Sequence, residues 1–390
     1  MAKVILKLGI KKRIEKGHPW VYKNEVDRIE GDYFPGDIVE VLNHKGIFLG
    51  KGYINPKSLI LVRLMTRNRD EKIDKEFFSR RITRAWEYRK KVMDTTSCRV
   101  IYGEADEIPG LIVDKFNDYL SLQTLTYGID QYKDIIADVL WEVVQPLGIY
   151  ERNDSQVRLL EGLDERKGKL RGDFEPATII NENGVKMLVD IKDGQKTGYF
   201  LDQKENRLSI KDIVKNGEVL DCFCHTGSFA LHAACFGANH VTAVDISEHA
   251  VDTARKNAEL NQLTDKIDFV CANAFDLLRE YEKQGRLFDV VILDPPAFTK
   301  SASKIKSAQK GYKEINLRGM KLVKPGGFLV TASCSHYMYP DLFRDTLREA
   351  ALDAKKIIRE VEYRTQAKDH PYLWNYEESL YLKFFILNVW

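Results

Sequence analysis

The chain lacks the features that mark secreted proteins, proteins with a structural zinc site, and membrane proteins. It has only six cysteines, with no C-x-x-C pair and no repeated spacing, which argues against a disulfide framework and a structural zinc site. It shows no signal peptide and no apolar run long enough to cross a bilayer, so we expect a cytoplasmic, reduced protein without metal or membrane partners. A charge excess is also lacking, with 60 Lys+Arg against 58 Asp+Glu, so only a local basic patch could bind nucleic acid.

What the chain does have is a nucleotide-type turn in its second half. An apolar strand leads into Asp221–Gly227 and a helix, and a second strand ends on Asp245 about 20 residues after the turn. That order places a ribose-binding carboxylate beside a turn that a ligand can approach. The full G-x-G-x-x-G is missing, because Asp221, Cys222 and Cys224 stand at glycine positions, and a pyrophosphate needs bare backbone there. S-adenosylmethionine carries no phosphate, so the pattern predicts a methyl-donor site.

A second motif follows a buried-type strand at 288–293. The strand delivers Asp294-Pro295-Pro296, and two prolines freeze the backbone behind the carboxylate. A polar group fixed at the carboxyl end of a central strand can hold a planar base edge against the donor methyl. The alternative is a stiff loop with a capping aspartate.

Cys334 follows the last predicted parallel strand and should lie on the same rim as Asp294. Pyrimidine C5 is a poor nucleophile until a thiolate adds to C6. Asp294 near N3 would stabilise that adduct by proton donation or hydrogen bonding. The thiol would need a lowered pKa, for which His336, Lys300 and Lys304 are candidate neighbours. The alternative is a small buried cysteine at a strand end.

Basic residues gather near the N-terminus, where Lys11, Lys12, Arg13 and Lys16 precede Trp20. Such a cluster beside aromatic rings can hold phosphates and stack on bases. The aromatic side chains could equally be core residues of a small barrel. Both interpretations stay open.

The order of elements predicts an α/β chain in several parts. Residues 1–70 read as an all-β unit with strands expected at 4–8, 37–41, 47–53 and 59–64, and 71–96 read as a connecting helix. Residues 97–187 read as a small α+β unit, and 188–390 as a doubly wound parallel sheet. The strands expected in this last part lie near 218–224, 240–246, 267–272, 288–294 and 327–333, followed by a terminal pair at 357–363 and 380–390.

Several motifs together resemble those of class I RNA methyltransferases, in the family that includes the bacterial 23S rRNA cytosine-C5 methyltransferases. They are Gly17-His-Pro-Trp-Val, 103–114, Tyr150-Glu-Arg-Asn-Asp, Gly194-Gln-Lys-Thr-Gly, Leu293-Asp-Pro-Pro-Ala-Phe, Ser333-Cys-Ser and Asp369-His-Pro. The resemblance implies an N-terminal PUA-type RNA-binding domain, a small central α+β domain, a C-terminal Rossmann-like methyltransferase domain, a ribosomal RNA substrate, and Cys334 as nucleophile. It departs from many RNA C5 methyltransferases, which carry Pro-Cys where this chain has Pro296-Ala297. That departure leaves the base for the C5 proton unassigned.

The predicted site has three sets of residues. The catalytic set is Cys334 and Asp294. The cofactor set is Phe200, Asp202, Cys222, Thr226, Gly227, Ser228, Phe229, Asp245, Ile246, Ser247, Asn273, Ala274, Phe275, Asp294 and Pro295. The substrate set is Lys11, Lys12, Arg13, Lys16, Lys196, Arg207 and Phe298. Asn273 would also suit a helix N-cap. The segment 194–207 reads as a lid or floor over the methyl donor, and the alternative is a plain loop that leads into a helix.

The leading hypothesis is an S-adenosylmethionine-dependent RNA cytosine-C5 methyltransferase acting on large-subunit ribosomal RNA. One rival enzyme methylates a guanine nitrogen (N7 or an exocyclic amine) and keeps Cys334 as a structural residue. Another rival is an RNA-binding assembly factor without turnover. A homodimer is left open.

Overall fold

The computed structural model describes residues 1–9, 12–299 and 301–390, so Lys11 and Lys300 lie outside the described residues. The chain forms two compact units. The first contains 1–180, 189–201 and 368–379, and the second contains 181–188, 202–367 and 380–390. Each unit is described by itself, and the domain boundaries expected from the sequence stay a prediction.

The first unit begins with a six-stranded sheet in the order β2-β6-β5-β4-β1-β3. Its strands are β1 (Lys3–Leu6), β2 (Trp20–Tyr22), β3 (Val26–Glu30), β4 (Ile38–Leu42), β5 (Phe48–Ile54) and β6 (Ile60–Thr66). Alternate residues face a small core that includes Val4, Val39 and Val62, all fully buried. The predicted all-β unit is confirmed, although the sequence analysis missed β2 and β3.

A mixed α+β layer completes most of the first unit. Its five-stranded sheet has the order β11-β10-β9-β8-β7, with β7 (Ser97–Tyr102), β8 (Leu111–Phe116), β9 (Tyr119–Thr124), β10 (Gly148–Asn153) and β11 (Arg166–Arg171). The helices are α1 (Lys75–Val92), α2 (Tyr127–Gln131), α3 (Lys133–Val144) and α4 (Val157–Leu160). Helix α1 starts where the Asp74 side chain accepts a hydrogen bond from the Phe77 amide, at 3.0 Å. Phe77, Ile82 and Trp86 then enter the core, as their helical spacing predicts.

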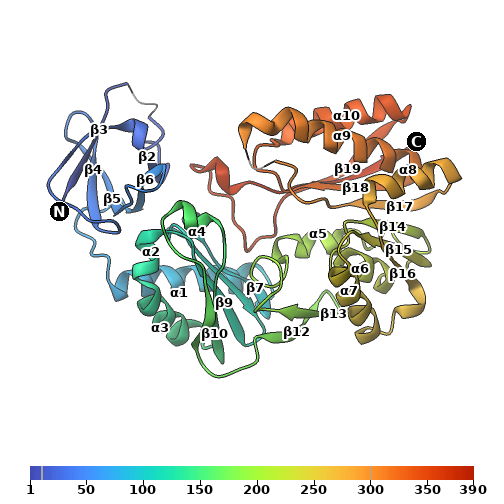
Figure 1. The fold of residues 1–390 in the computed structure, drawn as a ribbon, viewed down its shortest axis with the longest axis horizontal. Helices are drawn as coiled ribbons and strands as arrows, with labels where there is room; N and C mark the ends of the chain where they lie inside the picture. Colours follow the sequence, from blue (N-terminus) through green and yellow to red (C-terminus); the bar gives the residue numbers. More distant parts are fainter. Residues whose placement is uncertain (10–11, 300) are drawn as a thin grey trace. The chain divides into compact units, whose positions relative to one another are not determined.

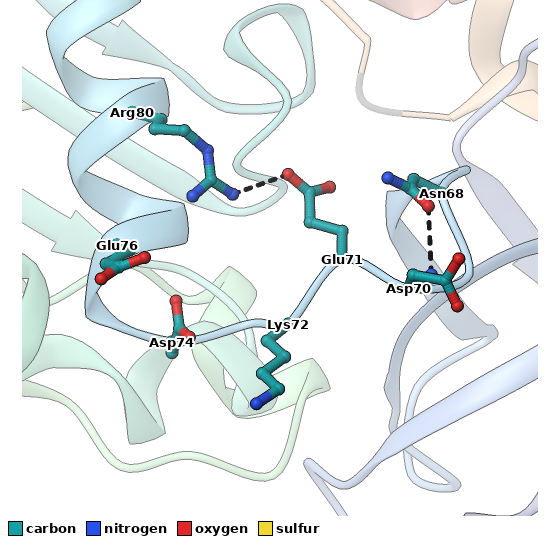
Figure 2. Close-up of a pocket in the computed structure, with 7 residues that line it drawn as sticks. All are labelled: Asn68, Asp70, Glu71, Lys72, Asp74, Glu76 and Arg80. Carbon is teal, nitrogen blue, oxygen red and sulfur yellow. Dashed lines mark hydrogen bonds and ion pairs between the residues drawn. The ribbon is translucent and has the colours of Figure 1, made fainter.

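The segment before α1 forms an open pocket of about 490 Å³ (Figure 2). Its lining is mostly charged, and Arg80 donates to Glu71 at 2.9 Å while the Asp70 amide donates to Asn68 at 3.0 Å. The residues that line it are Asn68, Asp70, Glu71, Lys72, Asp74, Glu76 and Arg80. None of them belongs to the predicted site.

The second unit is built around a seven-stranded sheet in the order β16-β15-β14-β17-β18-β20-β19. Strands β14 to β18 run parallel, and β20 runs antiparallel to both β18 and β19. The strands are β14 (Glu218–Cys222), β15 (His240–Asp245), β16 (Ile267–Cys271), β17 (Phe288–Leu293), β18 (Val323–Ser333), β19 (Ile358–Arg364) and β20 (Lys383–Val389). The predicted doubly wound sheet and its terminal strand pair are confirmed. A hairpin of β12 (Ala177–Glu182) and β13 (Val185–Asp190) precedes the sheet.

Helices cover both faces of this sheet (Figure 1). Helices α6 (Ser228–Cys235) and α7 (Glu248–Leu260) lie on one face, and α8 (Ala274–Gln284), α9 (Ile305–Leu322) and α10 (Pro340–Ala354) lie on the other. The short helix α5 (Lys204–Ser209) packs against α6. Since β14 and β17 are neighbours whose following helices go to opposite faces, their carboxyl ends form a topological switch point. Ligands bind at such switch points in open α/β sheets.

Among the described residues, no helix is long and apolar enough to cross a membrane.

Candidate functional site

The turn after β14 has an unusual backbone. Phe223 and His225 have φ of 65° and 50°, in the left-handed region that non-glycine residues seldom adopt. Gly227 has φ of 81°, and a Cβ there would lie 3.0 Å from the Cβ of Ala254 on α7. The Asn257 side chain donates to the carbonyl of Thr226 at 3.0 Å. The turn is therefore held against α7 in a strained shape, as is common where a backbone cradles a ligand.

Asp245 ends β15 beside that turn. One carboxylate oxygen accepts from the His225 amide and the other from the Ser247 amide, both at 2.9 Å. Each oxygen keeps a lone pair for a further donor such as a ribose hydroxyl. Ile246, the next residue, is 70% exposed, which is a high exposure for an isoleucine beside a fixed carboxylate. The pair suits a ligand with a sugar and a flat apolar ring.

Asn273 follows β16 and caps α8. Its side-chain oxygen accepts from the Phe275 amide at 2.9 Å, as the N-cap alternative predicts. Ala274 is buried, while the half-buried Phe275 ring lies 6.4 Å from that of Phe223 and 5.9 Å from that of Phe298. These aromatic rings form a rim next to the carboxyl ends of the strands.

Asp221 is a site residue that the sequence analysis did not select. It is fully buried at the end of β14, and neither carboxyl oxygen has a hydrogen-bond partner of normal geometry among the described residues. Burial, then the charges of Asp294 and Asp245, raise the pKa of this carboxyl well above its usual value, and the Ala230 amide lowers it only in part. Three carboxyl groups thus converge on one edge of the sheet. The charges of Asp245 and Asp294 repel a pyrophosphate and suit the sulfonium and ammonium groups of S-adenosylmethionine, so the donor set fits this cofactor.

Asp294 is half-buried after β17 and is held by a chain of side chains. Gln203 donates to its carboxylate at 3.0 Å. Asn206 donates to the Gln203 oxygen at 2.6 Å, and Arg364 donates to the Asn206 oxygen at 3.1 Å. Gln203 and Asn206 are buried. The sequence offered no signal for these partners, because Gln203 and Asn206 come from one distant segment and Arg364 from another.

Asp202, which belongs to the predicted cofactor set, is anchored by the end of the chain. The Tyr381 hydroxyl donates to its carboxylate at 2.5 Å, and the Ala367 amide donates to its carbonyl at 2.9 Å. The segment that carries Gln203 is therefore fixed at two points. Residues 194–201, which precede Asp202, belong to the first unit. There the Lys196 ammonium lies 4.5 Å from the centre of the Phe200 ring.

Cys334 follows β18 and lies beside the Asp-Pro-Pro segment. Its sulfur is 4.0 Å from the Pro295 carbonyl oxygen, and the residue is half-buried. Tyr312 of α9 lies 2.9 Å from the Ser335 hydroxyl, and burial raises its pKa to about 12. The neighbouring strands β17 and β18 thus place the two predicted catalytic residues, Cys334 and Asp294, on one rim.

The remaining cofactor residues lie mainly in the turn and the core. Ser228 is half-buried at the start of α6, whereas Cys222, Phe229 and Pro295 are buried. The Phe229 ring stacks on that of Phe384, with centres 6.1 Å apart, so its side chain is a core group.

The predicted substrate residues differ in how free their charges are. Lys12 and Lys16 are exposed. Arg13 forms two hydrogen bonds with Glu25, at 2.9 and 2.6 Å, and is therefore engaged within its own domain. Arg207 is buried and paired with Glu182 at 2.5 Å, so we withdraw it from the substrate set. Both side chains are 1% exposed and form two hydrogen bonds, as in a structural ion pair.

The aromatic residue Trp20 also has a structural place. Its indole N–H donates to Glu104 at 2.7 Å, and its ring lies 4.8 Å from that of Tyr376. Arg63 lies over the same ring, 5.6 Å from its centre. Of the two interpretations left open by the sequence, packing describes this side chain better than base stacking.

Among the described residues, no group of three or more His, Cys, Asp or Glu could hold a metal ion.

Comparison with known proteins agrees with this geometry. Residues 4–67 match the PUA-like domain family, and residues 164–370 match the S-adenosylmethionine-dependent methyltransferase family. A ribosomal RNA large subunit methyltransferase I from Salmonella arizonae is 40% identical over 394 residues, covering 99% of this chain and 97% of its own. The protein of that name from Aliivibrio fischeri is 41% identical, with 99% of each chain covered. This chain belongs to the ribosomal RNA large subunit methyltransferase I family.

Solved structures show the same fold. A crystal structure of a methyltransferase complexed with SAH (S-adenosylhomocysteine) has a TM-score of 0.86 at 22% identity, with 100% of both chains covered. A methyltransferase from Streptococcus mutans has a TM-score of 0.85 at 21% identity, again over 100% of both chains. The predicted fold class, enzyme class and cofactor are confirmed: the chain is an S-adenosylmethionine-dependent methyltransferase with an N-terminal PUA-like domain.

Proposed function

We propose that the enzyme methylates C5 of a cytosine in large-subunit ribosomal RNA, with Cys334 as the nucleophile. The observation that carries this proposal is the placement of the Cys334 sulfur 4.0 Å from the Pro295 carbonyl, directly after Asp294. A thiol and an acid on one rim are what C5 chemistry needs, whereas nitrogen methylation needs no thiol. The relatives' name supplies the ribosomal RNA part of the proposal.

The reaction follows from these two groups. The Cys334 thiolate forms a bond to C6, and the electron pair of the C5–C6 double bond becomes available at C5. In its protonated form Asp294 donates a hydrogen bond to N3 and so stabilises the negative charge that develops on the ring. S-adenosylmethionine, when bound, supplies an electrophilic methyl group. After C5 has taken the methyl, a base removes the C5 proton, the C5–C6 double bond reforms, and the bond from C6 to Cys334 breaks.

The cofactor would lie along the carboxyl ends of β14, β15 and β16. Asp245 would bind the ribose hydroxyls, and Ile246 and Phe275 would contact the adenine ring. The buried Asp221 would face the positive end of the cofactor, because it is the carboxyl group at this edge without a partner of normal geometry. Asp202 would border the cofactor from the segment before β14, and Phe200, two residues earlier, stays a predicted cofactor contact.

The RNA must present an unpaired base. A cytosine inside a helix cannot meet a thiol and a methyl donor together, so it has to leave its stack. We propose that the PUA-like domain contributes phosphate contacts through Lys12 and Lys16, with further contacts from Lys196 and Phe298. Binding through phosphates weakens as salt rises. A cytoplasmic location fits this substrate, and we keep a homodimer as part of the proposal.

The experiment uses RNA that contains 5-fluorocytosine, with S-adenosylmethionine and either the wild type or Cys334→Ala. Fluorine at C5 blocks the final elimination, so a C5 enzyme stays bound to its RNA as a denaturant-resistant adduct. We expect an adduct with the wild type and with Cys235→Ala, a control at an exposed cysteine, and none with Cys334→Ala. Methyl transfer to ribosomal RNA without any adduct would refute C5 chemistry and favour nitrogen methylation.

A further inference from the structure

Lys383 is a buried lysine directly behind the proposed nucleophile. It begins β20 and pairs with Ser333 of β18, the residue before Cys334. Its side chain is 1% exposed. The ammonium nitrogen donates to the Ser335 carbonyl and to the Tyr381 carbonyl, both at 2.7 Å. Lys383 therefore lies opposite the residue before Cys334 and binds the backbone carbonyl of the residue after it.

The surroundings of Lys383 are poor for a positive charge. Burial lowers its pKa to about 8, and the charge of Cys334 acts in the opposite direction. Within the part of the chain that the structure describes, no carboxylate lies within ion-pair distance of its nitrogen. A buried ammonium needs a counter-charge, because its hydration is lost. The Cys334 thiolate is the negative charge that raises the pKa of Lys383.

We infer that Lys383 is a positioning residue that holds the Ser335 carbonyl and acts as the counter-charge of the Cys334 thiolate. The inference rests on the proposed function, since it explains how a cysteine at neutral pH becomes nucleophilic. Because Coulomb interactions are mutual, a cation that is stabilised by a thiolate stabilises that thiolate equally.

The other titratable groups around Cys334 make such a cation necessary. Asp294 follows the neighbouring strand β17, and a carboxylate there opposes a second negative charge. Tyr312 from α9 stays neutral at physiological pH, since its pKa is about 12. His336 is two residues further along the chain. Lys383, from β20, is the lysine that the fold brings against this segment through the sheet.

The test is the rate of alkylation of Cys334 by iodoacetamide as a function of pH, read for each cysteine peptide by mass spectrometry. The thiolate is the reacting form, so the midpoint reports its formation. Lys383→Met should raise the midpoint for Cys334 by about one pH unit, which lowers the rate at pH 7 by about tenfold. The pH profile of kcat should move by the same amount, and Lys383→Arg should restore both toward the wild type. An unchanged midpoint in Lys383→Met would overturn the inference.

Controls separate charge from folding. Lys324→Met removes a lysine at the other end of β18, which is paired with Asp289, and should leave the Cys334 midpoint unchanged. The fully buried Cys98 should stay unreactive in all variants, which reports intact folding, and the exposed Cys235 should react alike in all of them.

A reciprocal measurement keeps the test valid if Lys383→Met does not fold. In Cys334→Ala the titration of Lys383, followed by NMR of selectively labelled lysine, should move to lower pH, because the counter-charge is gone. An unchanged Lys383 titration would overturn the inference. An adduct with 5-fluorocytosine RNA together with an unchanged alkylation midpoint would refute the role of Lys383 while leaving C5 chemistry intact. A shifted midpoint without any adduct would refute its catalytic use.

Discussion

Replacing Gln203 with leucine should remove the side chain that orients Asp294, the proposed catalytic acid. Gln203 is 4% exposed and donates to Asp294 at 3.0 Å, while its own oxygen accepts from Asn206 at 2.6 Å. Leucine has a similar size and no polar atoms. The substitution therefore breaks both hydrogen bonds without opening a large cavity.

The size of the effect follows from the two bonds. A hydrogen bond to a charged group contributes about 1.5–3 kcal/mol. If that energy is needed where Asp294 holds the base in the transition state, kcat falls by about 10- to 100-fold, since each 1.36 kcal/mol is a factor of ten. The Asn206 amide loses one acceptor but still donates to the Thr365 carbonyl at 3.2 Å, so the free energy of unfolding should fall by only about 1–3 kcal/mol.

The assay is single-turnover methyl transfer to ribosomal RNA at saturating cofactor, with cofactor affinity measured by calorimetry. The affinity should stay near the wild-type value, because Asp245 and its turn are untouched. Gln284→Leu is the matched control, since Gln284 makes a similar hydrogen bond to Glu280 on the exposed surface of α8. Wild-type kcat in Gln203→Leu, or an equal loss in cofactor affinity, would refute the reasoning.

Three further predictions concern charges at separate places. The raised pKa of Asp221 means that the folded state favours its protonated form, so the wild type loses stability as pH rises above about 4. Asp221→Asn should flatten that loss in urea unfolding and weaken cofactor binding, and an unaltered pH dependence would contradict it. Burial alone would raise the pKa of the Glu182 carboxyl, but the Arg207 charge lowers it below its usual value. The ion pair therefore stabilises the folded state fully at pH values above the pKa that Glu182 has in the unfolded chain, and this stabilisation is lost as pH falls through the folded-state pKa. Arg207→Met should cost about 3–5 kcal/mol at pH 7 and less near pH 4; an equal cost at both would argue against an ion-pair effect. Lys12→Ala with Lys16→Ala should weaken RNA binding and reduce the salt slope by about 0.7 for each lost phosphate contact, with unchanged cofactor affinity. A slope equal to that of the wild type would exclude both lysines from the interface.

The sequence by itself was enough for the catalytic sheet. Each parallel strand is a contiguous apolar run followed by a turn, and such runs can be recognised without knowing their neighbours. Asp245, Asp294 and Cys334 were found because each ends a strand or directly follows one, and the carboxyl ends of parallel strands meet at one edge. The missing glycine motif also separated this cofactor from a dinucleotide.

Elements with weak local patterns were missed. Strand β2 has only three residues, and β3 (Val26–Glu30) is largely exposed, with a burial pattern that a surface loop would share. Their pairing with β6 and β1 is what makes them strands. β-structure of this kind depends on its partner more than on its own residues.

Only the tertiary structure decided what surrounds the chemistry. Gln203 meets Asp294 across 91 residues, and Lys383 reaches the Ser335 carbonyl across 48. Arg207 looked like an RNA contact until its buried partner Glu182 was seen. The physical reason is that strand and helix periodicity encodes which face of an element is buried, whereas the partner of a buried polar group depends on which elements the fold brings together. The sequence thus determined where the reactive groups stand, and the packing of distant segments decided their charge and orientation.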